Sequence, residues 1–404
     1  MFRWDTKKLN EVTDIVMGQS PASSDCNEDG VGLPFYQGNA DFGYINPTPT
    51  RFCDKPKKVA EKGNILISVR APVGDLNILQ ETAAIGRGVS GISVKSINRD
   101  FLFYYLQYMK PKWARLQQGS TFTAINKGDL ANLDVPYPKH FEQQKIAAIL
   151  SSVDEAIEKT EQIISQTGRV KQGLMQQLLT KGIGHTNFKE TTVGEIPESW
   201  DVVELQNIAK VTGGKRLPKG VSLVDYDTGH PYIRVADLGE EGINMESIQF
   251  VPYEVATKIT RYRIYKGELY ISVAGTLGKV GEVPPELDGA NLTENADRLS
   301  EISCDKDYLK YVLKSSIVQR YINREQTLNA QPKLALTRIK KFIIPLPPKD
   351  EQMKIAEIIS SFELKLINET EKSNKLKNLK KGLMQQLLTG KVRVPGKAAR
   401  VITS

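Results

Sequence analysis

The segment that decides the fold is the octapeptide Gly173-Leu-Met-Gln-Gln-Leu-Leu-Thr180, which occurs again, unchanged, at Gly382-Leu-Met-Gln-Gln-Leu-Leu-Thr389. The offset of 209 residues between Gly173 and Gly382 also aligns Glu142–Ala147 with Glu351–Ala356. A constant offset shared by separate segments indicates an internal repeat, and a repeat determines the architecture of the whole chain. The chain is therefore two copies of one plan.

Each constant segment predicts one long helix. Apolar or seam positions recur at steps of four and three residues, which is the spacing of a coiled-coil seam. A helix of about 40 residues is roughly 60 Å long, so a small domain beside it cannot cover its apolar stripe. We expect the two helices to pair with each other and favour an antiparallel pair, although the pattern leaves a parallel pair open. The predicted seam is Ile146, Leu150, Val153, Ile157, Thr160, Ile164, Thr167, Lys171, Leu174 and Leu178 in the first copy, and Ile355, Ile359, Phe362, Leu366, Glu369, Ser373, Leu376, Lys380, Leu383 and Leu387 in the second.

The repeat divides the chain into five segments: a globular unit at 1–141, a helix at 142–181, a linker with a second unit at 182–350, a second helix at 351–391 and a tail at 392–404. Each globular unit mixes β-branched runs with turns rich in Gly, Pro and Asn. We expect strands at 64–70, 88–95, 231–236 and 268–274, and helices at 100–117 and 306–326. The predicted class is α+β, with two mixed α/β domains separated by the two long helices.

Length and composition favour an ordinary globular protein. The chain has 404 residues, of which 40% are hydrophobic and 25% charged, and this length corresponds to roughly two to three domains. No run approaches the ~18 consecutive apolar residues of a spanning helix, and the start of the chain lacks the apolar stretch of a signal peptide. We expect a cytoplasmic protein without membrane association.

The sequence gives little support to catalysis or metal binding. The three cysteines, Cys26, Cys53 and Cys304, are too scattered for a disulfide framework or a Cys-x-x-Cys site, and we expect buried thiols. The three histidines lack the His-Glu-x-x-His spacing of a zinc hydrolase. Phosphate-loop and dinucleotide-binding patterns are also missing from the sequence. We therefore predict a noncatalytic chain that carries neither a metal site nor a cofactor of its own.

Charge favours a polyanionic partner. Fifty-five Lys and Arg residues against 47 Asp and Glu give a net charge of +8. Lys and Arg neutralise phosphates, while Arg, Asn and Gln can hydrogen-bond to base edges in the major groove of double-stranded DNA. Both units place such residues in turns beside predicted strands. The predicted DNA-binding residues are Gln19, Ser20, Lys57, Lys58, Arg70, Asn77, Arg87, Thr121 and Thr123 in the first unit, and Lys215, Arg216, Arg234, Lys279, Asn291, Asn295, Asn329 and Gln331 in the second.

Two questions stay open at this level. The repeated octapeptide is either plain helix-pair core or a docking surface that exposes Gln176, Gln177, Gln385 and Gln386. The chain as a whole is either a DNA-reading adaptor or a coiled-coil scaffold whose two globules bind proteins. Salt dependence separates the second pair of alternatives, because an adaptor that contacts several phosphates loses affinity steeply as salt rises.

The chain resembles the specificity subunit of type I restriction and modification systems. The resemblance is carried by Gly194-Glu-Ile-Pro-Glu-Ser-Trp200, by Pro231-Tyr-Ile-Arg-Val-Ala-Asp-Leu238, by the proline-rich lead into Glu-Gln-x-Lys-Ile-Ala, and by the two octapeptides, and it extends from residue 1 to about 394. In the first unit, Met1–Trp4 keeps the tryptophan without the preceding proline, and Pro34–Asn39 replaces the second unit's Pro231–Ala236. Individual base contacts are therefore not transferable.

The resemblance implies two target-recognition domains, each reading one half of a split target in double-stranded DNA, held apart by an antiparallel pair of helices that acts as a ruler. It implies two modification subunits, which use S-adenosylmethionine to methylate adenine, and two restriction subunits as partners. Whether a restriction subunit accompanies this chain is left open by the sequence. The subunit itself would be noncatalytic.

Overall fold

The computed structural model describes residues 4–118, 124–239, 242–328 and 333–394. The chain forms two compact units: unit 1 consists of Met1–Ile164 with Glu369–Ser404, and unit 2 of Ser165–Asn368. Each unit thus combines a globular part with one half of each long helix. The predicted segments Thr121, Thr123, Asn329 and Gln331 lie outside the described residues.

Unit 1 contains two sheets packed at one junction. The first is four-stranded in the order β2-β10-β7-β8, and the second is five-stranded in the order β3-β5-β4-β9-β6. A short pair, β1-β11, completes the unit. The strands are β1 (Asp5–Lys8), β2 (Thr13–Met17), β3 (Cys26–Asn27), β4 (Leu33–Tyr36), β5 (Phe52–Cys53), β6 (Val59–Ala60), β7 (Ile65–Ser68), β8 (Leu76–Ile78), β9 (Ala83–Ile85), β10 (Val89–Val94) and β11 (Asp134–Tyr137), and the helices are α1 (Leu9–Val12), α2 (Arg99–Gln118) and α3 (Lys127–Ala131).

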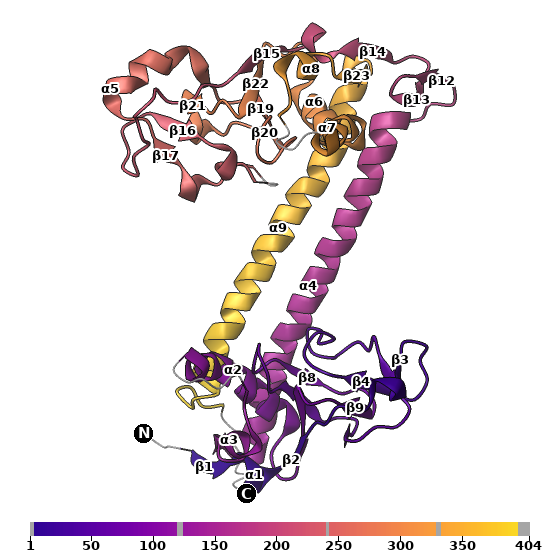
Figure 1. The fold of residues 1–404 in the computed structure, drawn as a ribbon, viewed down its shortest axis with the longest axis vertical. Helices are drawn as coiled ribbons and strands as arrows, with labels where there is room; N and C mark the ends of the chain where they lie inside the picture. Colours follow the sequence, from indigo (N-terminus) through magenta and orange to yellow (C-terminus); the bar gives the residue numbers. More distant parts are fainter. Residues whose placement is uncertain (1–3, 119–123, 240–241, 329–332, 395–404) are drawn as a thin grey trace, which may run out of the picture. The chain divides into compact units, whose positions relative to one another are not determined.

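The core of unit 1 lies between the four-stranded sheet and α2. The central strand β10 pairs antiparallel with both neighbours, so that Ile92 is opposite Ile15 on one side and Ile65 on the other. These three side chains are buried and share one face of the sheet, because directly opposed residues in a ladder point the same way. From α2, Phe101 and Leu102 are fully buried in the same cluster. Figure 1 shows α2 beside β8 in this unit.

Unit 2 repeats most of this topology with other side chains, but its second sheet has one strand fewer, and it adds a two-stranded pair, β12-β13. Its four-stranded sheets have the orders β15-β22-β19-β20 and β17-β16-β21-β18, and the short pair is β14-β23. In both units the second sheet contains one parallel pair, β4 with β9 and β16 with β21. The elements are β12 (Phe188–Thr191), β13 (Gly194–Pro197), β14 (Asp201–Glu204), β15 (Lys210–Gly213), β16 (Pro231–Ile233), β17 (Gln249–Phe250), α5 (Tyr253–Ala256), β18 (Arg263–Ile264), β19 (Leu269–Ser272), β20 (Val280–Glu282), β21 (Ala290–Leu292), β22 (Ala296–Ser300), α6 (Lys306–Lys314), α7 (Ser316–Leu328), α8 (Leu336–Lys340) and β23 (Ile343–Leu346).

The long helices are α4 (His140–Lys181) and α9 (Lys349–Leu387), and in each unit one half of α4 lies beside one half of α9 (Figure 1). Every predicted seam residue is buried or half-buried. In the octapeptides the leucines Leu178, Leu179, Leu387 and Leu388 are buried, whereas all four glutamines are exposed. The octapeptide is therefore core on one side and free surface on the other.

Ion pairs along the seam show that the helices run antiparallel. In unit 1, Lys380 contacts Asp154 at 2.7 Å, and Lys377 contacts Glu161 at 2.7 Å. Residue numbers therefore increase along α4 in the direction in which they decrease along α9. In unit 2, Lys171 contacts Glu363 at 2.5 Å. The pairs Lys380–Asp154 and Lys171–Glu363 occupy equivalent positions of the repeat. The predicted α+β class and the antiparallel pairing are confirmed.

A glutamate that is buried in unit 1 and half-buried in unit 2 lies in the first turn of each long helix. In unit 1, Glu142 accepts hydrogen bonds from Arg393 at 2.7 and 2.9 Å and from the backbone N–H of Val394 at 3.4 Å. In unit 2, Glu351 accepts from Trp200 Nε1 at 3.0 Å and lies 2.8 Å from His185 Nε2. Residues 392–394, to which the sequence assigns no role, therefore bind the first turn of α4 in unit 1. The segment after α4 binds the first turn of α9 in unit 2 in the same way.

Several expected elements differ in detail. The helix expected at 306–326 is two helices, α6 and α7, because Ser315 is extended (φ −77°, ψ 164°) and its hydroxyl oxygen accepts the backbone N–H of Ile317. The second long helix ends at Leu387 rather than at 391. Of the cysteines, Cys53 is buried as expected, while Cys26 and Cys304 are half-buried.

We predict that Lys380→Met destabilises unit 1 by about 3–5 kcal/mol, because it leaves the Asp154 carboxylate, whose side chain is 1% exposed, without its cation. Lys171→Met should cost less, since the Glu363 side chain is 26% exposed. Urea unfolding of the full chain measures both. Lys381→Met, at an exposed neighbouring position, is the matched control, and an equal loss in that variant would contradict the role given to the pair.

Candidate nucleic-acid interface

The two sheets of unit 1 meet where four strands end. The backbone N–H of Gly18, after β2, donates to Val89 at 3.0 Å, and that of Gln19 donates to Ile85 at 2.9 Å. The turn between β9 and β10 is also bonded to the end of β4, because Gly86 N–H donates to the Tyr36 carbonyl at 2.9 Å. These bonds join the strand ends into one rigid edge.

Glycines allow this close approach. A Cβ added at Gly18 would lie 2.2 Å from the Gly86 carbonyl oxygen, and one added at Gly88 would lie 2.4 Å from the Gln37 carbonyl oxygen. Gly88 N–H donates to the Gln37 carbonyl at 3.1 Å, and Val69 N–H donates to the Gly88 carbonyl at 2.9 Å. The backbone of three segments therefore packs without intervening side chains, and the flanking side chains form the edge.

We call the resulting set of side chains the unit 1 rim, which consists of Gln19, Ser20, Gln37, Arg70 and Arg87. Gln19, Arg70 and Arg87 are exposed. The hydroxyl of Ser20 and the side-chain amide of Gln37 hydrogen-bond at 2.9–3.0 Å. The rim therefore presents two cations together with hydroxyl and amide groups, which can bind phosphates and base edges respectively.

Unit 2 repeats the same backbone bonds. Gly214 N–H donates to Ala296 at 3.1 Å, Lys215 N–H to Leu292 at 2.8 Å, and Thr293 N–H to Ile233 at 3.0 Å. Val273 N–H donates to the Asn295 carbonyl at 2.7 Å, as Val69 does to Gly88. We call the side chains that flank these bonds the unit 2 rim, which consists of Lys215, Arg216, Arg234, Glu294, Asn295 and Lys333.

The side chains at equivalent rim positions differ between the units. Arg216 forms a 2.6 Å ion pair with Glu294 at the place where unit 1 has Ser20 and Arg87. Partial burial acts to raise the pKa of Glu294, but the hydrogen bond from Arg216 leaves it below its ordinary value. The isolated bridge Arg70↔Ala124 of unit 1 corresponds to Ala274↔Lys333 of unit 2. The cationic side chain is therefore on the first segment of the bridge in unit 1 and on the second segment in unit 2.

Of the thirteen predicted DNA-binding residues that the structure describes, eight lie on these rims, Arg234 among them. Gln19, Ser20, Arg70 and Arg87 belong to the unit 1 rim, and Lys57 and Lys58 are exposed nearby, since the Lys58 carbonyl accepts the N–H of Ile85 at 3.0 Å. Lys215, Arg216 and Asn295 belong to the unit 2 rim. For the predictions at Thr121, Thr123, Asn329 and Gln331 the structure describes no position.

Two of the predicted DNA-binding residues, Asn77 and Asn291, are not exposed on the rims, because their side chains are buried. Asn77 has no exposed surface, and its side chain bonds to the backbone of Gly43 in both directions, at 2.9 and 3.0 Å. Asn291 is 1% exposed and donates to the Ile259 carbonyl at 2.8 Å. The side-chain amide of an Asn beside a turn can hydrogen-bond to the protein backbone as readily as to the edge of a base.

Arg234 and Lys279 hold a loop of unit 2. The guanidinium of Arg234 donates to both carboxylate oxygens of the fully buried Asp237, at 3.0 and 2.7 Å, and to the Ser247 carbonyl at 2.5 Å. The hydrogen bond to Asp237 raises the pKa of Arg234. Lys279 Nζ donates to the Leu238 carbonyl. These contacts give both side chains a structural role in the 235–249 segment.

Three rim residues, Gln37, Glu294 and Lys333, are absent from the predicted set. Gln37 stands in the Pro34–Asn39 stretch, where the first unit departs from the second, and that departure was the available signal. Lys333 follows the Asn-Ala-Gln-Pro segment at 329–332. Beside the unit 2 rim, Asp297 is 4% exposed on β22, and burial raises its pKa to about 6.

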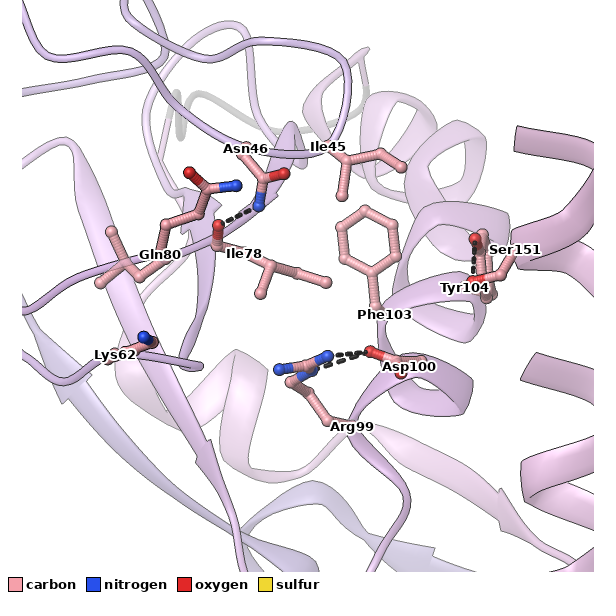
Figure 2. Close-up of a pocket in the computed structure, with 11 residues that line it drawn as sticks. Ile45, Asn46, Lys62, Ile78, Gln80, Arg99, Asp100, Phe103, Tyr104 and Ser151 are labelled. Atoms are coloured by element: carbon pink, nitrogen blue, oxygen red, sulfur yellow. Dashed lines mark hydrogen bonds and ion pairs between the residues drawn. The ribbon is translucent and has the colours of Figure 1, made fainter. Parts of the chain in front are cut away.

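A cavity of about 600 Å³ in unit 1 lies between the 45–46 turn, β8 and the start of α2 (Figure 2). Most of its polar side chains are engaged within the protein in the hydrogen-bonded pairs that Figure 2 draws: Asn46 with the Ile78 carbonyl, Arg99 with Asp100, and Tyr104 with Ser151. Lys62 is exposed at its edge. With its polar groups paired in this way, the cavity does not have the convergent free donors of a cofactor site.

Within residues 4–118, 124–239, 242–328 and 333–394, no group of three or more His, Cys, Asp and Glu side chains is placed to hold a metal ion. No described helix combines the length and the apolarity needed to cross a membrane.

Comparison with known proteins gives a family. The profile of the type I restriction modification DNA specificity domain matches residues 1–166 and 197–378. The chain belongs to this family. It is a specificity subunit, a noncatalytic member of a type I restriction and modification system, and the resemblance drawn from the sequence is confirmed.

Individual relatives agree with this assignment. The specificity subunit of the type I restriction enzyme MjaIX from Methanocaldococcus jannaschii is 25% identical over 417 residues, which cover 97% of this chain and 94% of the relative. A protein assigned as the MjaX specificity subunit of the same organism is 46% identical over 168 residues, or 41% of this chain and 40% of the relative's length. The crystal structure of a type I specificity subunit from M. genitalium has the same fold, with a TM-score of 0.62 and 17% identity over 95% of this chain and 96% of that one.

Proposed function

We propose that this specificity subunit reads a split target in double-stranded DNA, with the unit 1 rim on one half-site and the unit 2 rim on the other. The observation that supports this most directly is the repeated backbone frame with different side chains. An identical frame places side chains at equivalent points of a groove, and different side chains there select different bases. Segments 1–141 and 182–350 would be the two readers.

In the same proposal, segments 142–181 and 351–391 form the frame that fixes the spacer between the half-sites. The pairs Lys380–Asp154 and Lys171–Glu363 lock α4 and α9 in register within each unit. Two readers on one duplex contact the same face when their half-sites are about one helical turn apart, on the order of 34 Å. A helix pair of fixed register would hold that spacing constant.

We further propose that two modification subunits dock on the exposed sides of the two octapeptides. Gln176 and Gln177 are exposed and match Gln385 and Gln386, which are exposed as well. Val170 and Leu379, six residues before Gln176 and Gln385 at equivalent positions, are 43% and 52% exposed. Identical free surface on two units whose readers differ favours two copies of one partner. The modification subunits would carry S-adenosylmethionine and methylate adenine in each half-site, and two restriction subunits would complete the complex where the system has them.

The direct test is selection from a random duplex library by the chain in complex with its modification subunit, followed by sequencing of the bound DNA. We expect two short motifs at one fixed spacing. Binding through six or more phosphate contacts should weaken by about 10³-fold or more between 50 and 200 mM salt. An intact complex that enriches no motif and responds weakly to salt would support the protein-binding scaffold instead.

The docking proposal is tested by stoichiometry. Gln176→Arg with Gln177→Arg should reduce the bound modification subunits from two to one, and the same changes at Gln385 and Gln386 should remove the other. Gln162→Arg is the matched control, because Gln162 is an exposed glutamine on α4 whose repeat equivalent is a glutamate, Glu371. Mass photometry of the assembled complex measures the count. Two bound copies in both double variants would refute this docking surface.

A further inference from the structure

Two of the three cysteines lie opposite each other in unit 1. Strand β3 pairs antiparallel with β5, and the register places Cys26 directly across from Cys53. The backbone N–H of Asp54 donates to the carbonyl of Asp25 at 3.0 Å, one residue beyond this pair on each strand. That pattern identifies Cys26 and Cys53 as a non-hydrogen-bonded pair, in which the Cα atoms are about 4.5 Å apart and the side chains are closest.

The two thiols point to the same side of the sheet. Directly opposed side chains share one face, and both cysteines pack in the small cluster formed with Phe35, Ala84 and Leu33. The Cα separation of such a pair falls within the roughly 4.4–6.8 Å that disulfides span. A bond between the two sulfurs therefore requires no rearrangement of either strand.

The two thiols differ in exposure, so they would take different roles in a thiol–disulfide exchange. Cys26 is half-buried and reaches solvent, whereas Cys53 is buried, and burial raises the pKa of the Cys53 thiol. A thiolate is the attacking species in thiol chemistry. The accessible Cys26 is thus the thiol that an oxidant meets first, and Cys53 is placed to resolve the product.

We propose that Cys26 and Cys53 are a reversible oxidation site, which a low-molecular-weight disulfide converts into a disulfide that links β3 to β5. In the first step the Cys26 thiolate attacks one sulfur of the reagent disulfide, forms a mixed disulfide and expels one thiolate. In the second step the Cys53 sulfur attacks the Cys26 sulfur, the bond to the reagent breaks, and a second thiolate leaves. The two cysteine protons pass to the departing thiolates, so two thiols of the reagent are formed for each disulfide closed.

This site is independent of the proposed DNA reading, although the loop that it closes contains β4 and the rim residue Gln37. Closing the segment from Cys26 to Cys53 restricts the unfolded chain, so oxidation should raise the unfolding temperature of unit 1. Cys304, in unit 2, lies outside this pair and is the internal control for general oxidation.

The experiment treats the folded full chain with glutathione disulfide, alkylates the remaining thiols and maps the peptides by mass spectrometry. We expect a peptide linked through Cys26 and Cys53 that is lost on reduction, with Cys304 alkylated. The same treatment in urea should lower the yield of this link. A folded chain that stops at glutathione on Cys26, links Cys304 instead, or keeps both thiols free would overturn the proposal.

Variants separate the two steps. Cys53→Ala should stop at the mixed disulfide of Cys26, whereas Cys26→Ala should leave Cys53 reduced because it is buried. Cys304→Ala should form the Cys26–Cys53 link at the wild-type rate. Since Cys26 is only half-buried, Cys26→Ala tests the assignment even where the change at Cys53 impairs folding. Rapid glutathionylation of Cys53 in that variant would contradict the order of steps.

Discussion

The largely enclosed carboxylate in the first turn of each long helix is the constraint on which the rest of each unit depends. The side chains of Glu142 and Glu351 are 1% and 13% exposed, and a buried carboxylate without partners is costly. Arg393, from the segment after α9, satisfies Glu142, and His185 and Trp200, from the segment after α4, satisfy Glu351. The start of one helix is thereby held beside the end of the other, which is an antiparallel pairing.

The two units meet this constraint with different chemistry. In unit 2 the indole N–H of Trp200 donates to Glu351. In unit 1 the bidentate Arg393 occupies both oxygens of Glu142, and Trp4 Nε1 is left buried without a partner while the guanidinium lies 5.5 Å from the Trp4 ring centroid. The same principle holds at the rims, where equal backbone bonds carry unequal side chains. A frame shared by the two units, with exchangeable contacts, agrees with the proposal that the two units read different half-sites.

The sequence predicts the frame well and the rims less well, for a physical reason. Helix periodicity is local, so the steps of four and three residues suffice to find the seam and its pairing. The place of Gln37 depends instead on the hydrogen bonds that Gly86 N–H donates to the Tyr36 carbonyl and Gly88 N–H donates to the Gln37 carbonyl. These partners are distant in the chain, so no spacing reveals them. Asn77 and Asn291 were misplaced because residue type alone cannot tell whether an amide bonds to the backbone or faces solvent. The role of residues 392–394 needed the position of Glu142.

We propose, in short, one backbone frame that presents two different readers. This proposal is tested most directly by repeating the duplex selection with Arg70→Ala and with Lys333→Ala, the rim cations of unit 1 and unit 2 at equivalent bridges. We expect Arg70→Ala to relax or weaken one half-motif and Lys333→Ala to affect the other, with the spacing unchanged in both variants. Changes in the same half-motif, or an equal loss across both half-motifs in each variant, would contradict the proposal.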